Sequence, residues 1–150
     1  MRELYLDTEF NGFKGEFISM GIHDPKGADF YAVIDSPYRP NEFVTKHVLP
    51  NLKDTPIDSI LFRKELTYYF SSKFDECCVY ADWPEDFTHL LSFFCGPKGR
   101  KYIKRMTFKL ITTPDIHISK TPHNALEDAI AFYKNHQEML KEESQNDQTS

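Results

Sequence analysis

The sequence predicts an α/β fold in which helices flank a mixed sheet of five strands. Three strand-like segments, at residues 3–10, 16–22 and 29–34, are joined by short turns, which favours an antiparallel meander. Two further apolar strands, at residues 78–83 and 106–111, alternate with helical segments, as is typical of parallel crossovers. We therefore expect antiparallel and parallel pairing in the same sheet.

The helical segments follow from apolar residues at helical spacing. We expect a short helix over residues 41–49 and longer helices over residues 59–74 and 86–95. The last helix has the clearest start, because Asn124 is a good N-cap and Glu127, three residues later, completes a capping-box-like pair. Its expected buried stripe consists of Leu126, Ala129, Ile130, Tyr133 and Leu140.

One domain is expected to account for nearly all of the chain. A length of 150 residues with 40% hydrophobic residues provides enough apolar material for a single core. We assign residues 1–141 to this domain. Residues 142–150 are polar throughout, and we expect them to form a disordered tail.

Charge and cysteine content restrict the class of protein. A net charge of −5 does not indicate a strongly basic nucleic-acid binder, although bound cations would supply positive charge locally. The three cysteines include the adjacent pair Cys77 and Cys78 and show no zinc-site spacing, which favours reduced thiols in an intracellular protein. No apolar run approaches 18 residues and no signal pattern is present, so we expect a cytoplasmic protein without a membrane span.

Two acids occupy the first predicted strand. Because side chains alternate along a strand, Tyr5, Asp7 and Glu9 share one face. Two carboxylates on one face repel each other, and a divalent cation removes that repulsion; hard oxygen ligands suit Mg²⁺ or Mn²⁺. The alternative is an acidic pair that faces solvent.

Further acids lie at the starts of two predicted helices. His123 lies just before the last helix, and Asp128 lies about one turn inside it. Asp82 ends a strand, and Asp86 opens the helix that follows. Each acid is also consistent with a simple helix start, where the macrodipole favours a negative charge.

The segments LDTEF, DWPEDFTHLL and HNALEDA occur in this order. They resemble the three exonuclease motifs of the DEDDh group, which comprises 3′–5′ exonucleases of the RNase H-like superfamily. The resemblance spans Leu4 to Phe132. Within the group, the chain length and the stretch YAVIDSPYRPNEFVTKHVLPNL are most similar to the small mycobacterial-type 3′–5′ exoribonucleases. The resemblance implies an RNase H-like, exonuclease-type arrangement of the five-stranded sheet.

The resemblance also implies roles for the matching residues. It makes Asp7 and Glu9 the first two metal-binding acids, Asp128 the fourth, and His123 the general base. Two divalent ions roughly 4 Å apart stabilise the attacking and leaving oxygens of a phosphodiester. An imidazole with an ordinary pKa near 6.5 is suited to take a proton from the attacking water.

The second motif departs from the pattern of the group. The group has Asn, then three residues, then Asp at the head of a helix. Here Asp82 occupies the position of the Asn, and Asp86 occupies the position of the Asp. Glu85 stands where Phe or Tyr usually precedes that acid. We favour Asp86 as the third metal acid and keep Asp82 as the alternative ligand.

Other residues are candidates for substrate binding. Phe10, Phe13 and Trp83 flank the acidic motifs, and aromatic rings of this kind stack on bases or simply pack in a core. Asn11 follows the first motif, and Gly12 permits close backbone approach. The basic run at residues 96–105 is suited equally to phosphate contacts and to a solvated loop.

The predicted function is metal-dependent removal of nucleotides from the 3′ end of single-stranded nucleic acid. The closer resemblance favours RNA; a DNA exonuclease of the same group is the first alternative. The pattern of His123 and Asp128 argues against an RNase H-type endonuclease. A non-catalytic nucleic-acid-binding or adaptor module that retains the fold is the remaining alternative. The resemblance is compatible with a homodimer, because exonucleases of this group are often dimeric; the sequence itself does not give the oligomeric state.

Overall fold

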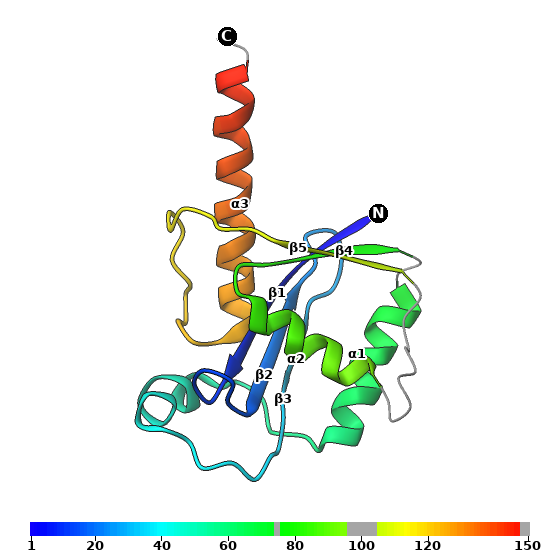
Figure 1. Cartoon of the computed structure of the whole chain (residues 1–150), viewed down its shortest axis with the longest axis vertical. Helices are drawn as coiled ribbons and strands as arrows, with labels where there is room; N and C mark the ends of the chain where they lie inside the picture. The colour runs from blue at the N-terminus through cyan, green and yellow to red at the C-terminus, as the bar shows by residue number, and fades with distance from the viewer. Residues whose placement is uncertain (74–75, 96–104, 148–150) are drawn as a thin grey trace.

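The computed structural model describes residues 1–73, 76–95 and 105–147. The described residues form a five-stranded mixed sheet in the order β3-β2-β1-β4-β5, flanked by helices (Figure 1). The strands are β1 (Arg2–Phe10), β2 (Phe17–His23), β3 (Phe30–Val33), β4 (Cys77–Ala81) and β5 (Met106–Leu110).

Strand pairing places β1 in the centre of the sheet. β1 is antiparallel to β2, and β2 is antiparallel to β3, as the short turns predict. On its other side β1 pairs in parallel with β4, and β4 pairs in parallel with β5. The predicted combination of a meander with parallel crossovers is confirmed.

The helices of the described residues are η1 (Val44–Val48), η2 (Leu49–Asn51), α1 (Ser59–Lys73), α2 (Pro84–Phe94) and α3 (Ala125–Asp147). The prediction of one short helix over residues 41–49 needs correction, because η1 is a π-helical segment and η2 is a 3₁₀ turn. Pro50 lies at the start of η2, where its missing N–H removes a donor that a continuing α-helix would need.

The two faces of the sheet are covered by different helices. Leu4 and Leu6 of β1 belong to the main core, which includes Phe62 and Leu66 of α1 and residues of α2. Tyr5 points to the opposite face and packs against Phe132 of α3. The alternation predicted for β1 therefore separates the α1/α2 side of the sheet from the α3 side.

The end of α3 differs from the expected disordered tail over residues 142–147, and residues 148–150 lie outside the described part of the chain. The helix continues through residue 142 to Asp147 and projects beyond the sheet (Figure 1). Glu, Lys and Gln are good helix formers, and Lys141 Nζ lies 2.8 Å from Glu138 Oε1 one turn earlier, so this polar segment is able to continue the helix. Leu140, expected in the buried stripe, is 41% exposed because it lies on this projecting part.

Two other expectations concern the surface of the molecule. Within residues 1–73, 76–95 and 105–147, no helix combines the length and apolar character that crossing a membrane requires. The basic run at residues 96–105 lies outside the described residues except for Arg105, whose guanidinium is 3.7 Å from the Glu76 carboxylate.

Candidate metal centre

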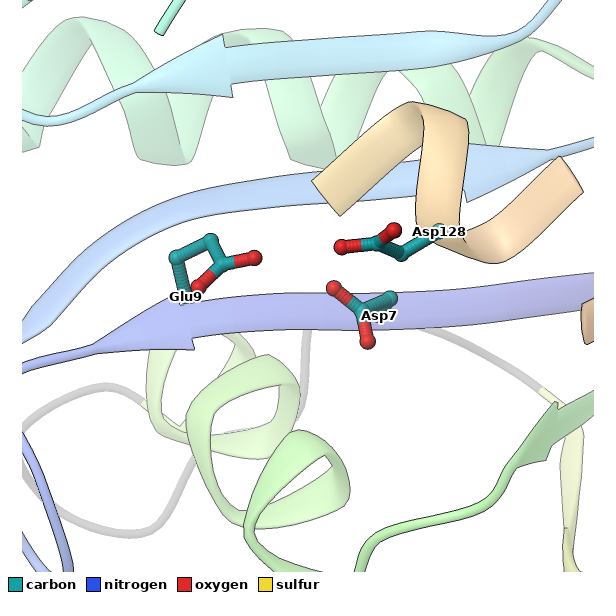
Figure 2. A group of neighbouring side chains, drawn as sticks. All are labelled: Asp7, Glu9 and Asp128. Carbon is teal, nitrogen blue, oxygen red and sulfur yellow. The ribbon is translucent and has the colours of Figure 1, made fainter. Parts of the chain in front are cut away.

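The site is built on the α3 side of the central strand. Asp7 and Glu9 follow Tyr5 on this face of β1, and Figure 2 shows both carboxylates rising from the strand toward α3. Both residues are partly buried. The sheet therefore holds two acids side by side beneath the first turn of a helix.

A close approach of α3 to β2 brings Asp128 to this strand. Gly21 pairs with Asp7 across the β1–β2 ladder. A Cβ at Gly21 would lie 2.2 Å from the backbone nitrogen of Leu126, so a larger residue would push the helix away. The missing side chain allows the N-terminus of α3 to rest directly on the sheet and places Asp128 over Asp7 (Figure 2).

The loop entering α3 orients both its histidine and its acid. His123 has a φ of 63°, a conformation that non-glycine residues adopt rarely, and its N–H donates to Asp128 Oδ2 at 2.9 Å. Asn124 accepts from the Glu127 N–H at 3.3 Å, as the predicted N-cap requires, and its amide donates to Asn51 O. These hydrogen bonds thus fix the positions of His123 and Asp128 relative to the first turn of α3.

Two acids reach the centre from the β4–α2 junction. Asp86 is 1% exposed, and its Oδ1 accepts from both the N–H and the hydroxyl of Thr8, at 3.1 and 2.6 Å. These bonds attach the start of α2 to β1 beside Asp7. Asp82, in the preceding loop, is exposed but also lies near Asp7.

The carboxylates form two groups that share one residue. Oxygens of Asp7, Glu9 and Asp128 lie within 4.8 Å of one another, and so do oxygens of Asp7, Asp82 and Asp86. In Figure 2 one Asp7 oxygen faces the Asp128 carboxylate and the other points away from it. Asp7 therefore bridges an α3-side group and an α2-side group, and both candidates for the third acid belong to the second.

The acids are poorly compensated by the protein itself. Oδ2 of Asp7 and Oδ2 of Asp86 are buried and have no hydrogen-bond partner within the described part of the chain. Burial, followed by the charges of Asp86 and Glu9, raises the pKa of Asp7 well above its ordinary range. Burial and the Asp128 charge raise the pKa of Glu9 to about 8, and burial raises the pKa of Asp86 to about 7.

These features fit a site for hard divalent cations. An all-carboxylate donor set suits Mg²⁺ or Mn²⁺. Unpartnered buried oxygens have lone pairs available for coordination, and bound cations would reverse the repulsion that raises the pKa values. Asp7, Glu9 and Asp128 would hold one ion, and Asp7 with Asp86 or Asp82 would hold the other.

A cavity of about 580 Å³ opens beside the acids. We refer to it as the aromatic cavity, because Phe10, Phe13, Phe43 and Trp83 line it together with the acids and His123. The ring of Phe43 meets the imidazole of His123 edge to face, with centroids 5.1 Å apart. His123 also lines a second cavity of about 570 Å³, which shares Asp7, Asp82 and Asp128 with the aromatic cavity.

The predicted substrate residues have different positions. Phe10, Gly12, Phe13 and Trp83 line the aromatic cavity, as expected from their place beside the motifs. Asn11 braces neighbouring loops instead: its amide donates to Glu16 and to Arg39 O, and its carbonyl accepts from the Asn41 N–H.

Sequence reasoning missed three residues of this site. Gly21 carried a signal, because an isolated glycine within a strand pattern often marks close backbone approach. No sequence pattern around Phe43 indicated a role in the site. The loop that follows β3 carries Phe43 to the imidazole of His123. Glu85 is a departure from the motif in the sequence, yet it lines the cavity and accepts hydrogen bonds from the Lys14 N–H and the Trp83 indole.

Comparisons with known proteins add no assignment. The chain matches no protein-family model, and no curated protein is similar to it at a significant level. The site is therefore interpreted from its own geometry.

Proposed function

We propose that this protein is a divalent-metal-dependent 3′–5′ exonuclease that acts on single-stranded nucleic acid, with RNA as the favoured substrate. The observation that carries the proposal is the pair of carboxylate groups that share Asp7. Two neighbouring cation sites with a common acid are the arrangement that in-line phosphodiester hydrolysis uses. The aromatic cavity beside them has a volume suited to a small ligand.

The arrangement of the sheet supports the proposal. A central β1 between an antiparallel meander and two parallel strands is compatible with an RNase H-like fold. In that arrangement the acids of the first strand meet acids from helices on both faces, as Asp86 and Asp128 do here. The sequence resemblance to DEDDh exonucleases also supports an exonuclease activity.

In the proposed mechanism each residue has a distinct task. Divalent cations, when bound, supply positive charge that stabilises the phosphorane-like transition state. Asp7, Glu9, Asp86 and Asp128 hold them. His123, on its loop beside Asp128, takes the proton of the attacking water. The Phe43 ring restricts where the imidazole lies, which favours one orientation of the base.

The aromatic cavity supports the proposal of a single-stranded substrate. Bases stack on exposed rings only when they are free of a duplex, and such stacking tolerates any base. Three rings of this cavity are largely exposed: Phe13, Phe43 and Trp83, with 78%, 53% and 52% of their surface accessible. A 3′-terminal base held there would leave its phosphate at the acids.

The test uses single-stranded RNA labelled at its 5′ end, incubated with Mn²⁺ or Mg²⁺. An exonuclease of this direction produces a ladder that shortens one nucleotide at a time from the 3′ end. Asp7→Asn should abolish the ladder, whereas Asp54→Asn, a matched change on an exposed loop, should not. A gel shift without cleavage would instead indicate a binding or adaptor module, and internal cuts in an RNA–DNA hybrid would indicate an endonuclease. The same assay with single-stranded DNA decides between the two exonuclease alternatives.

A further inference from the structure

Glu85 joins two parts of the aromatic cavity that are far apart in the sequence. It lies in the first turn of α2, next to Asp86. One carboxylate oxygen, Oε1, accepts from the backbone N–H of Lys14 at 2.7 Å. The other oxygen, Oε2, accepts from the indole Nε1–H of Trp83 at 3.0 Å. One oxygen therefore binds the residue that follows Phe13, and the other binds Trp83; both Phe13 and Trp83 line the cavity.

The segment that Glu85 holds on the β1–β2 side is a strained loop. Gly12 and Lys14 have positive φ angles of 77° and 56°, and Gly15 N–H closes a turn onto Gly12 O at 2.8 Å. This geometry turns Phe13 outward at the mouth of the cavity. Within the described residues, the bond from Lys14 N–H to Glu85 is the hydrogen bond that links this turn to α2.

Trp83 is exposed in the same way. It directly precedes α2 in an extended conformation, and its ring projects from the helix start rather than into the core. An exposed indole has several rotamers of similar energy unless a bond selects one. The hydrogen bond from Trp83 Nε1–H to Glu85 favours one rotamer of the Trp83 side chain.

We propose that Glu85 is a positioning residue that holds Phe13 and Trp83 as an aromatic clamp for the nucleobase of the 3′-terminal nucleotide. This proposal deepens the proposed function and rests on it for the identity of the ligand. Glu85 acts through the two rings: it governs how tightly the base is held, and it takes no part in hydrolysis. The charge of Glu85 is not needed for stacking; its two acceptor oxygens are.

A simpler role for Glu85 is a favourable charge at a helix N-terminus. That role needs no specific partner and predicts an effect on stability alone. The structure shows more, because the bond to Lys14 N–H spans 71 positions of sequence and Glu85 itself lines the cavity. The two roles are separated by measuring base binding.

The experiment exploits Trp83, which is the single tryptophan of the chain. Its fluorescence is titrated with nucleoside 5′-monophosphates in EDTA, so that metal binding does not contribute. Stacking on the indole should quench the emission of the wild type. Glu85→Ala should shift the free emission to longer wavelength and weaken nucleotide binding about tenfold, as expected when two hydrogen bonds to a charged acceptor are lost.

Two further variants sharpen the test. Glu85→Gln retains one acceptor oxygen, so it should recover part of the affinity. Glu65→Gln makes the same change on the exposed side of α1 and should behave as wild type. With RNA and Mn²⁺, Glu85→Ala should raise KM about tenfold while kcat changes less than about threefold.

The outcomes distinguish this proposal from the proposed function. A wild type that cleaves RNA, with unchanged nucleotide affinity and KM in Glu85→Ala, would overturn the clamp and leave the exonuclease. A wild type that does not cleave, but binds nucleotides in a Glu85-dependent manner, would support the clamp and reject the exonuclease. Absence of quenching in the wild type at millimolar nucleotide would overturn the clamp directly.

Discussion

Replacing Glu9 by Gln should make the metal-free protein more stable. The carboxyl group of Glu9 has a pKa of about 8 in the folded protein, raised from 4.5 by burial and by Asp128. At pH 7 the unfolded chain carries this group ionised, whereas the folded protein holds it protonated. Folding therefore takes up a proton, and stability declines as the pH rises from about 4.5 through 8. The isosteric amide removes this dependence.

The magnitude follows from the linkage between protonation and folding. A pKa raised from 4.5 to about 8 costs the folded state at most about 3 kcal/mol at pH 7. Glu9 is partly exposed and shares its repulsion with Asp128, so we expect about 1 to 2 kcal/mol. For a domain of this size that corresponds to a rise in Tm of about 3 to 6 °C.

The assay is thermal unfolding of wild type, Glu9→Gln and the control Glu65→Gln in EDTA at pH 4, 6 and 8. The difference between Glu9→Gln and wild type should be small at pH 4, where the acid is protonated in both states, and largest at pH 8. With saturating Mn²⁺, wild type should instead melt at a higher temperature than Glu9→Gln. Mn²⁺ at 100 times its Kd stabilises the wild type by about 2.7 kcal/mol, whereas the variant has lost one of the metal ligands. A variant that melts below wild type in EDTA, or a difference that is independent of pH, would refute the reasoning.

The remaining predictions concern the other residues of the site. Asp7→Asn should abolish cleavage and lose Mn²⁺ binding measured by calorimetry, because Asp7 belongs to both acid groups; near wild-type cleavage would exclude it as a ligand. Asp86→Asn should be inactive and Asp82→Asn only slowed in single-turnover assays, because Asp86 holds a buried free oxygen; the reverse order would make Asp82 the ligand. His123→Ala should lower turnover by a factor on the order of 10² to 10⁴ with Mn²⁺ affinity retained, as expected for a general base, and unchanged turnover would remove it from the mechanism. Gly21→Ala should displace α3, lowering stability by about 1 to 3 kcal/mol in denaturant unfolding and weakening Mn²⁺ binding; a neutral effect would show that the close approach is not needed.

Much of the fold follows from local patterns. Alternation along a strand is a property of consecutive residues, so the sequence alone predicts that Asp7 and Glu9 share a face. The short turns between the first three strands likewise predict their antiparallel pairing, and Asn124 marks the start of α3. The end of α3 was not predictable in this way, because helix-forming polar residues such as those after Leu140 also occur in disordered tails.

The sequence by itself determined which residues carry carboxylates and an imidazole, and on which elements they lie. Only the tertiary structure decided that these elements meet. The α3 acid reaches β1 because Gly21 has no side chain, and the α2 acid reaches it because Thr8 binds Asp86. Such contacts join residues distant along the chain, and their geometry depends on how the helices pack against the two faces of the sheet. Periodicity within one segment carries no information about that packing, which is why the contacts of Glu85 and Phe43 could not be predicted from the sequence.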